Sequence, residues 1–252
     1  MIQVPQEFVV AEECRKATWQ NGYRRALGEQ EGWAGFGSTT AKGTVYLAAE
    51  SAQGPWYLGL DHPGVIAELV LPTIDLPGPG FGRFAFDTLG SLYAVLSRVY
   101  ELGVSLPNGP LEAFVAQTQA LPKETEAERL VVQRVGQNIF RDSLLVYWSG
   151  SCPLTGIANT ALLRASHIKP WKVCDTDFER LDVHNGLLLS ALWDATFDAG
   201  LVTFEDDGTP HFSEALGKEA RALLPWASPL PLTDKHRAYL AWHRAKEFSK
   251  KP

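Results

Sequence analysis

Between residues 164 and 198 the chain has its one dense set of side chains able to transfer a proton or bind a metal ion. The set includes His167, Asn185, Asp194 and Asp198. A histidine with a pKa near ~6.5 can accept a proton from water at neutral pH. Carboxylates supply the hard oxygen ligands that Mg²⁺ and Mn²⁺ prefer. A base and a cation together are what phosphodiester hydrolysis needs, because the cation stabilises the charge on the phosphate and the leaving oxygen.

Local signals predict which elements position these side chains. The pattern of Ala165–Ile168 predicts a short strand that carries His167 and ends before Pro170, which has no N–H group to donate. Asn185-Gly186 is a turn signal. The expected layout is therefore a hairpin that carries the histidine, followed by a turn and a helix.

The helix is predicted from apolar residues after that turn. From Leu187 to Phe197 they recur at helical spacing, so we expect the helix to begin soon after Gly186. Asp194 and Asp198 are four residues apart on it, which places both carboxylates on one face. The alternative interpretation is a satisfied interior histidine and a solvated pair of aspartates.

Three segments in this order resemble HNH (ββα-metal) endonucleases. The resemblance is to a subgroup with Ser-His-Ile-Lys-Pro-Trp, Asn-Gly-Leu-Leu-Leu and Phe-Asp-x-Gly-Leu, which here are Ser166–Trp171, Asn185–Leu189 and Phe197–Leu201. It extends over roughly residues 125–248. It implies a metal-dependent endonuclease that acts on DNA. The oxygen ligands of Asp194 and Asp198 favour Mg²⁺ or Mn²⁺ over Zn²⁺ as the divalent cation. Related enzymes often act as dimers to cut both strands, which makes a homodimer an expectation here.

The same resemblance implies a role for each site residue. His167 corresponds to the general base, and Asn185 to the residue that braces the motif and orients the histidine. Asp194 lies nine positions after Asn185, where many members have histidine, and is expected to bind the metal ion with Asp198. Many members have Asp or His immediately before the base, whereas this chain has Ser166, so the full set of metal ligands stays open. Two cations near His167 are expected to contact phosphate, Lys169 and Arg164.

The wider sequence predicts an α+β protein of two modules. Residues 1–122 are expected to form a mixed strand and helix module that selects the target. Residues 123–252 are expected to form the ββα-metal (HNH) nuclease core flanked by helices. Thr125 and Glu128 have the spacing of a capping box, which predicts a long helix to about Trp148. Asp206-Asp207-Gly208 predicts a hairpin turn, and Thr233 is expected to cap a final helix.

In the first module we expect a helix over Glu12–Leu27 and an aromatic loop over Gly32–Gly37. Strands are expected at residues 45–47, 56–58 and 65–71. Five aromatic side chains of this module could stack on a modified or flipped base, although an aromatic core explains them as well. They are Trp19, Trp33, Phe36, Trp56 and Tyr57.

Composition limits the class of protein. The net charge of −6 argues against broad coating of DNA but allows a local basic cleft. Three scattered cysteines without a Cys-x-x-Cys pair predict a reducing, cytoplasmic setting and no zinc ribbon. The first residues have no secretory-signal pattern, and no apolar run approaches the ~20 residues that span a bilayer. Besides a nuclease, the sequence leaves open a catalytically decayed nuclease scaffold that binds DNA or regulates, and a small-molecule receptor in the first module.

Overall fold

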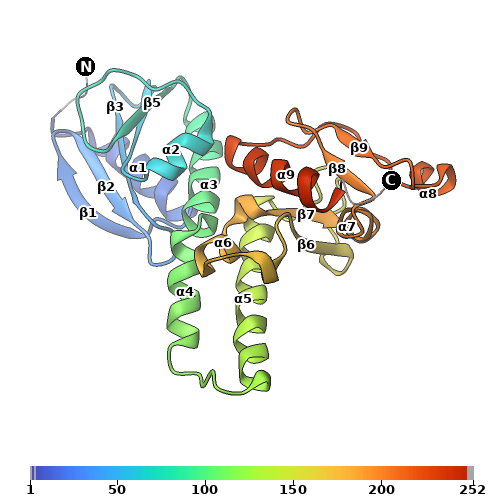
Figure 1. The fold of residues 1–252 in the computed structure, drawn as a ribbon. Coiled ribbons are helices and arrows are strands. Elements are labelled where there is room, and N and C mark those ends of the chain that lie inside the picture. The colour runs from blue at the N-terminus through green and yellow to red at the C-terminus, as the bar shows by residue number, and fades with distance from the viewer. Residues whose placement is uncertain (1, 3, 249–252) are drawn as a thin grey trace. The chain divides into compact units, whose positions relative to one another are not determined.

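The computed structural model describes residue 2 and residues 4–248 (Figure 1). The chain divides into two units, residues 1–109 and residues 110–252. The sequence-based division after residue 122 assigns the whole of helix α4 (Asn108–Thr118) to the first module, whereas contacts assign its residues from Pro110 onward to the second unit. Helices and antiparallel strands occur in both units, so the fold is mixed α+β.

The first unit is built on one antiparallel sheet in which each strand pairs with the next along the chain (Figure 1). Its strands are β1 (Arg25–Gln30), β2 (Trp33–Gly37), β3 (Thr44–Ala49), β4 (Trp56–Leu60) and β5 (Gly82–Phe86). Both faces of β4 are buried, whereas all six residues of β1 at the sheet edge are exposed. The core of this unit therefore lies at the middle strands.

Three helices belong to this unit: α1 (Phe8–Gln20), α2 (Pro63–Leu69) and α3 (Leu89–Ser105). The apolar face of α3 is buried, with Leu92, Leu96 and Val99 at most 1% exposed. Thr88 caps α3 by accepting a hydrogen bond from the backbone N–H of Ser91.

The predicted strands at residues 45–47 and 56–58 are confirmed, and three other expectations for this unit are wrong. Residues 33–37 form β2 rather than a loop, because their aromatic and small residues fit between two paired strands. Residues 65–69 are helical, since Pro63 opens α2 and the ring of His62 accepts a hydrogen bond from the backbone N–H of Val65. The first helix ends at Gln20, so Leu27 lies in β1.

In the second unit, the long helix α5 (Glu126–Tyr147) confirms the predicted capping box. The Thr125 hydroxyl accepts from the backbone N–H of Glu128, and the Glu128 carboxylate accepts from the backbone N–H of Thr125. Trp148 follows as the C-terminal cap. This helix contacts both strands of the hairpin that carries the predicted site.

That hairpin consists of β6 (Leu163–His167) and β7 (Gly186–Ser190), followed by helix α7 (Ala191–Asp198). The strands are antiparallel, and His167 pairs with Gly186. The predicted helix beginning soon after Gly186 is wrong for Leu187–Leu189, which are strand residues. Every residue of β7 is buried, and an apolar run buried on both faces of a strand has no alternation to distinguish it from a helix. Between the strands lie three short helical elements, η2 (Trp171–Val173), α6 (Asp177–Leu181) and η3 (Val183–Asn185). A further short element, η1 (Thr160–Leu162), precedes β6.

The rest of the unit follows the sequence signals. Strands β8 (Val202–Phe204) and β9 (Pro210–Phe212) flank the predicted turn, and Thr233 caps α9 (Asp234–Lys246). A short helix, α8 (Lys218–Ala222), lies between β9 and α9. None of the helices within the described residues has the length and apolar character needed to cross a membrane.

Candidate active site

The predicted base, His167, and the predicted metal ligands, Asp194 and Asp198, lie on opposite faces of the β6–β7 ribbon. Successive side chains of a strand point to opposite faces. The Ser166 hydroxyl donates a hydrogen bond to Oδ1 of Asp198 on α7, at 3.4 Å. The next residue, His167, packs instead against Phe140 of α5. The imidazole and the carboxylates therefore approach the ribbon from different sides, with His167 at the end of β6.

Three groups hold the His167 ring. Its face stacks on the Phe140 ring, with 3.7 Å between centroids and 16° between planes. Its edge meets the Trp171 indole at a centroid distance of 5.7 Å. Its Nε2 donates a hydrogen bond to the backbone carbonyl of Arg180, at 2.9 Å. The imidazole is thus fixed in both plane and rotation.

This hydrogen bond determines which ring nitrogen can act as a base. A carbonyl oxygen only accepts, so Nε2 must carry the proton, and Nδ1 of the neutral ring keeps its lone pair. Among the described residues, no hydrogen bond reaches Nδ1 of His167. Burial lowers the pKa of His167 to about 4, against a smaller raising effect of the Arg180 carbonyl. The ring is therefore neutral at pH 7.

Asp194 and Asp198 lie on one face of α7, as the sequence predicts, and both have a raised pKa. Burial is the main cause for each carboxyl. The negative charge of Asp194 raises the pKa of Asp198 further, while the Ser166 hydroxyl lowers the pKa of both. Arg164 also lowers the pKa of Asp194 by its charge. Two neighbouring carboxyl groups whose ionisation is disfavoured by burial, beside a hydroxyl, form a donor set suited to a hard divalent cation.

The donor set stops at these two carboxylates. Within the described part of the chain, no group of three or more His, Cys, Asp and Glu side chains is placed to hold a metal ion. Mg²⁺ commonly binds to one or two carboxylates and keeps water or phosphate oxygens as its other ligands. The residues present therefore fit Mg²⁺ or Mn²⁺ bound together with substrate, rather than a zinc ion enclosed by protein.

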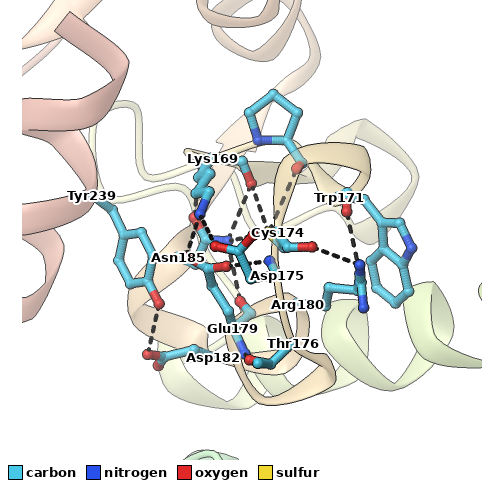
Figure 2. Close-up of polar contacts among 11 residues, drawn as sticks. Lys169, Trp171, Cys174, Asp175, Thr176, Glu179, Arg180, Asp182, Asn185 and Tyr239 are labelled. Atoms are coloured by element: carbon cyan, nitrogen blue, oxygen red, sulfur yellow. Dashed lines mark hydrogen bonds and ion pairs between the residues drawn. The ribbon is translucent and has the colours of Figure 1, made fainter. Parts of the chain in front are cut away.

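Asn185 is fully buried and holds the segment after β6 in place (Figure 2). Its Oδ1 accepts from the backbone N–H of Lys169, at 2.8 Å. Its Nδ2 donates to the backbone carbonyls of Lys169 and Glu179, each at 3.1 Å. These bonds link the end of β6 to α6, whose Arg180 carbonyl holds His167. Asn185 therefore does not contact the imidazole; it holds the backbone segment whose Arg180 carbonyl binds His167.

Lys169 is committed to two carboxylates (Figure 2). Its Nζ lies 2.7 Å from Oε1 of Glu179 and 3.3 Å from Oδ2 of Asp175. The hydrogen bond to Glu179 is the main reason that the pKa of Lys169 is raised. Arg164 is more exposed, and its Nη1 donates to the carbonyls of Ala161 and Leu163. Of the two cations expected at phosphate, Arg164 is the more available.

Two of the four acidic residues that precede Asn185, Glu179 and Asp182, have structural contacts, whereas Asp175 and Asp177 are exposed. The Glu179 carboxylate pairs with Lys169 and accepts from the backbone N–H of Asp175, at 2.8 Å. Asp182 is buried and lies 2.6 Å from Nδ1 of His184. Tyr239 of α9 donates to the other Asp182 oxygen, at 3.3 Å. Glu179 and Asp182 therefore connect the loop, η3 and the last helix.

Sequence reasoning missed two contributors to the His167 environment, Arg180 and Phe140. Arg180 acts through its backbone carbonyl, which every residue possesses, so no side-chain signal could identify it. Its guanidinium donates to the carbonyls of Trp171 and Cys174, at 3.2 and 2.6 Å. Phe140 belongs to the apolar face of α5, where it is not distinguished from other core residues.

The aromatic side chains of the first unit are mostly core. Trp33 and Trp56 are 1% and 2% exposed, and Phe36 and Tyr57 are each 7% exposed. Trp19 is exposed on α1, beside the guanidinium of Arg24. Four of the five rings therefore pack inside the unit, and they do not form an open cage for a base.

A hairpin followed by a helix, with a histidine on the first strand and two aspartates on the helix, is the order of elements expected from the resemblance to ββα-metal nucleases. In agreement, residues 152–205 match the model of a family described as HNH endonuclease. The matched segment includes β6, β7 and α7 with all six predicted site residues. This match supports a nuclease of the HNH type, with DNA as the implied substrate. A comparison with curated proteins found no match.

Proposed function

We propose that this protein is a DNA endonuclease that depends on Mg²⁺ or Mn²⁺, with its second unit as the cleavage unit. The observation that carries the proposal is the Nε2–H bond of His167 to the Arg180 carbonyl, which leaves Nδ1 as the unprotonated nitrogen. The family match over residues 152–205 supports the same reaction class. Asp194 and Asp198 are the proposed metal ligands, and Asn185 is the residue that orients the base through the loop backbone.

In the proposed reaction, Nδ1 of His167 takes a proton from a water molecule. The water oxygen forms a new bond to phosphorus, one ester P–O bond breaks, and the leaving oxygen takes up a proton. A divalent cation held by Asp194 and Asp198 would supply positive charge to the phosphate and the leaving oxygen. Within the described chain, β6 pairs with β7 alone, so a phosphate beside the other edge of β6 could approach side chains from both faces.

Arg164 is the proposed phosphate contact. It is exposed on β6, two residues before Ser166 on the same face, and its charge acts on Asp194. Lys169 could contact phosphate only by giving up its pairs with Glu179 and Asp175. We therefore expect Arg164→Gln to weaken DNA binding and to lower the slope of log affinity against log salt concentration by about one. Lys169→Gln should change both the affinity and the slope less.

The test is cleavage of plasmid DNA by the full chain with Mg²⁺ or Mn²⁺ and with EDTA. We expect wild type to nick or cut only with the metal ion and His167→Ala to lose activity by roughly 100-fold or more. His211→Ala is the matched control, because His211 is exposed on β9 and lies outside the site. Equal cleavage by wild type and His167→Ala would refute the catalytic assignment.

We further propose that the first unit selects the target, in a cytoplasmic restriction or defence role. The support is the division into two units with the family match confined to the second. One centre per chain would require two copies to cut both strands, so a homodimer is the proposed assembly. Comparing the cleavage rates of methylated and unmodified DNA, for wild type and for variants of either unit, tests whether the first unit recognises a base modification. Equal rates would mean that this unit can recognise only DNA sequence or shape.

A decayed scaffold that binds DNA without cutting it is the second candidate. The observation in its favour is Ser166, together with only two carboxylates at the proposed metal site. Calorimetry with Mn²⁺ separates the two functions. Absence of Mn²⁺ binding, with DNA affinity unchanged by EDTA, would favour the decayed scaffold. Mn²⁺ binding that is lost in Asp194→Asn would favour the nuclease.

A further inference from the structure

Helix α5 supplies two residues that face the loop of His167 and lie outside the segment that matches the HNH family. These are Gly136 and Phe140, both buried. They are four residues apart, so they lie on the same side of the helix. The matched segment begins only at residue 152, so the family resemblance gives neither of them a role.

Phe140 limits the rotation of the base. Its ring is 1% exposed and lies parallel to His167, with 3.7 Å between centroids. It also covers Gly186, the residue that pairs with His167 across the ribbon, since a Cβ atom on Gly186 would lie 2.4 Å from Cζ of Phe140. Turning the imidazole out of its plane would drive it into the Phe140 ring. The stack therefore keeps Nε2 directed at the Arg180 carbonyl.

Gly136 positions the second ring that contacts His167. A Cβ atom on Gly136 would lie 2.4 Å from Cη2 of Trp171, so the indole rests directly on the helix backbone. The Trp171 ring meets His167 edge to face, at 89° between planes. The Arg180 guanidinium lies 5.9 Å from the same indole and donates to the Trp171 carbonyl. The close approach of α5 at Gly136 therefore fixes the contact of Trp171 with the edge of the His167 ring, whereas Phe140 fixes the contact with its face.

We propose that Gly136 and Phe140 are positioning residues for the general base. They hold the imidazole so that Nε2 stays on the Arg180 carbonyl and Nδ1 remains available to water. The effect on catalysis rests on the proposed function. The orientation and tautomer of the His167 ring can be measured whether or not the protein cleaves DNA. The cleavage unit therefore needs α5 in addition to the matched segment.

The experiment uses the full chain and two independent readouts. Nitrogen-15 NMR of labelled histidine reports which nitrogen of His167 is protonated, and His167→Gln assigns the signal. Single-turnover cleavage and DNA affinity are measured in parallel. For Phe140→Leu we expect a mixed tautomer, a cleavage rate lower by roughly 10- to 100-fold, and DNA affinity within about twofold of wild type.

Phe204→Leu is the matched control, because Phe204 is a fully buried phenylalanine of the same unit on β8. We expect it to keep the wild-type tautomer and to cleave within about twofold of wild type. Gly136→Ala, which displaces Trp171, should change the tautomer in the same direction as Phe140→Leu. If Phe140→Leu does not fold, the tautomer and cleavage rate of Gly136→Ala test the proposal instead.

Unchanged tautomer and cleavage in whichever of the two variants folds would overturn the positioning role. Failure of the proposed function is separate: if wild type does not cut DNA, the tautomer of His167 still decides whether α5 holds the ring. A loss of DNA affinity as large as the loss of rate would also contradict the proposal, since it would indicate damage to substrate binding.

Discussion

The Lys169 ammonium lies 2.7 Å from Oε1 of Glu179, and the two side chains are only 13% and 19% exposed. The pair links Lys169, two residues after His167, to helix α6. The same helix supplies the Arg180 carbonyl that accepts the hydrogen bond from His167. The limited exposure of the pair reduces screening by solvent, so it should contribute more than an ordinary surface ion pair.

We expect Lys169→Met and Glu179→Gln each to lower the free energy of unfolding by about 1–2 kcal/mol. The double variant should lose less than the sum, because the same interaction is removed twice. Urea denaturation of the four proteins measures the coupling. Strictly additive losses would mean that the pair contributes nothing beyond its separate side chains.

Replacing Asn185 by aspartate should destabilise the protein by roughly 2–4 kcal/mol, although the shape is kept. A carboxylate can still accept from the Lys169 N–H but cannot donate to the carbonyls of Lys169 and Glu179, and it would be a buried charge. Thermal or urea unfolding measures the loss. Asn159→Asp is the control, since Asn159 is exposed and its Oδ1 only accepts, from the Ala161 N–H. Similar stability of the Asn185 and Asn159 variants would contradict the bracing role.

Asp198→Asn should have opposite effects with and without a metal ion. In EDTA at neutral pH, ionised Asp198 is disfavoured by burial and by the charge of Asp194, so the variant should be as stable as wild type or slightly more stable. In Mn²⁺, wild type should gain melting temperature with increasing concentration and the variant should gain little. Asp207→Asn serves as control, because Asp207 lies in the exposed β8–β9 turn. An equal Mn²⁺-dependent gain in all three proteins would place the ion elsewhere.

The buried His243 should make stability depend on pH between about 6.5 and 4. Burial lowers its pKa to about 4, while its pKa in the unfolded chain is near ~6.5. The unfolded state therefore binds the proton first, so this contribution is complete above pH ~6.5 and is lost as pH falls towards 4, by roughly 1–3 kcal/mol. Unfolding of wild type and His243→Gln across this range measures it. The variant should show a shallower decline, to which His167, with its similarly lowered pKa, still contributes.

The matched control is His211→Gln, since His211 is exposed. It should follow the wild-type decline. If His243→Gln also follows it, the stack of His243 on Phe197 and its hydrogen bond to Thr203 do not exclude the proton from the folded state.

Elements with a signal in neighbouring residues were predictable. The capping box at Thr125 began α5 as expected, and the turn around Gly208 and the cap at Thr233 were also confirmed. Segments whose structure depends on burial were not. Leu187–Leu189 became a strand because α5 and α7 both contact the hairpin, and burial on both faces removes the alternation that reveals a strand.

The sequence by itself determined the chemical groups and their order: a histidine before a proline-terminated strand end, an asparagine before a glycine, and two aspartates one helical turn apart. Tertiary structure alone decided their surroundings. It put His167 on Phe140 and the Arg180 carbonyl, directed Ser166 to Asp198 on the other face, and paired Lys169 with Glu179. Spacing along a chain specifies which face of an element a side chain occupies. What meets that face depends on packing between elements distant in sequence, and that packing sets burial, charge and the tautomer of the base.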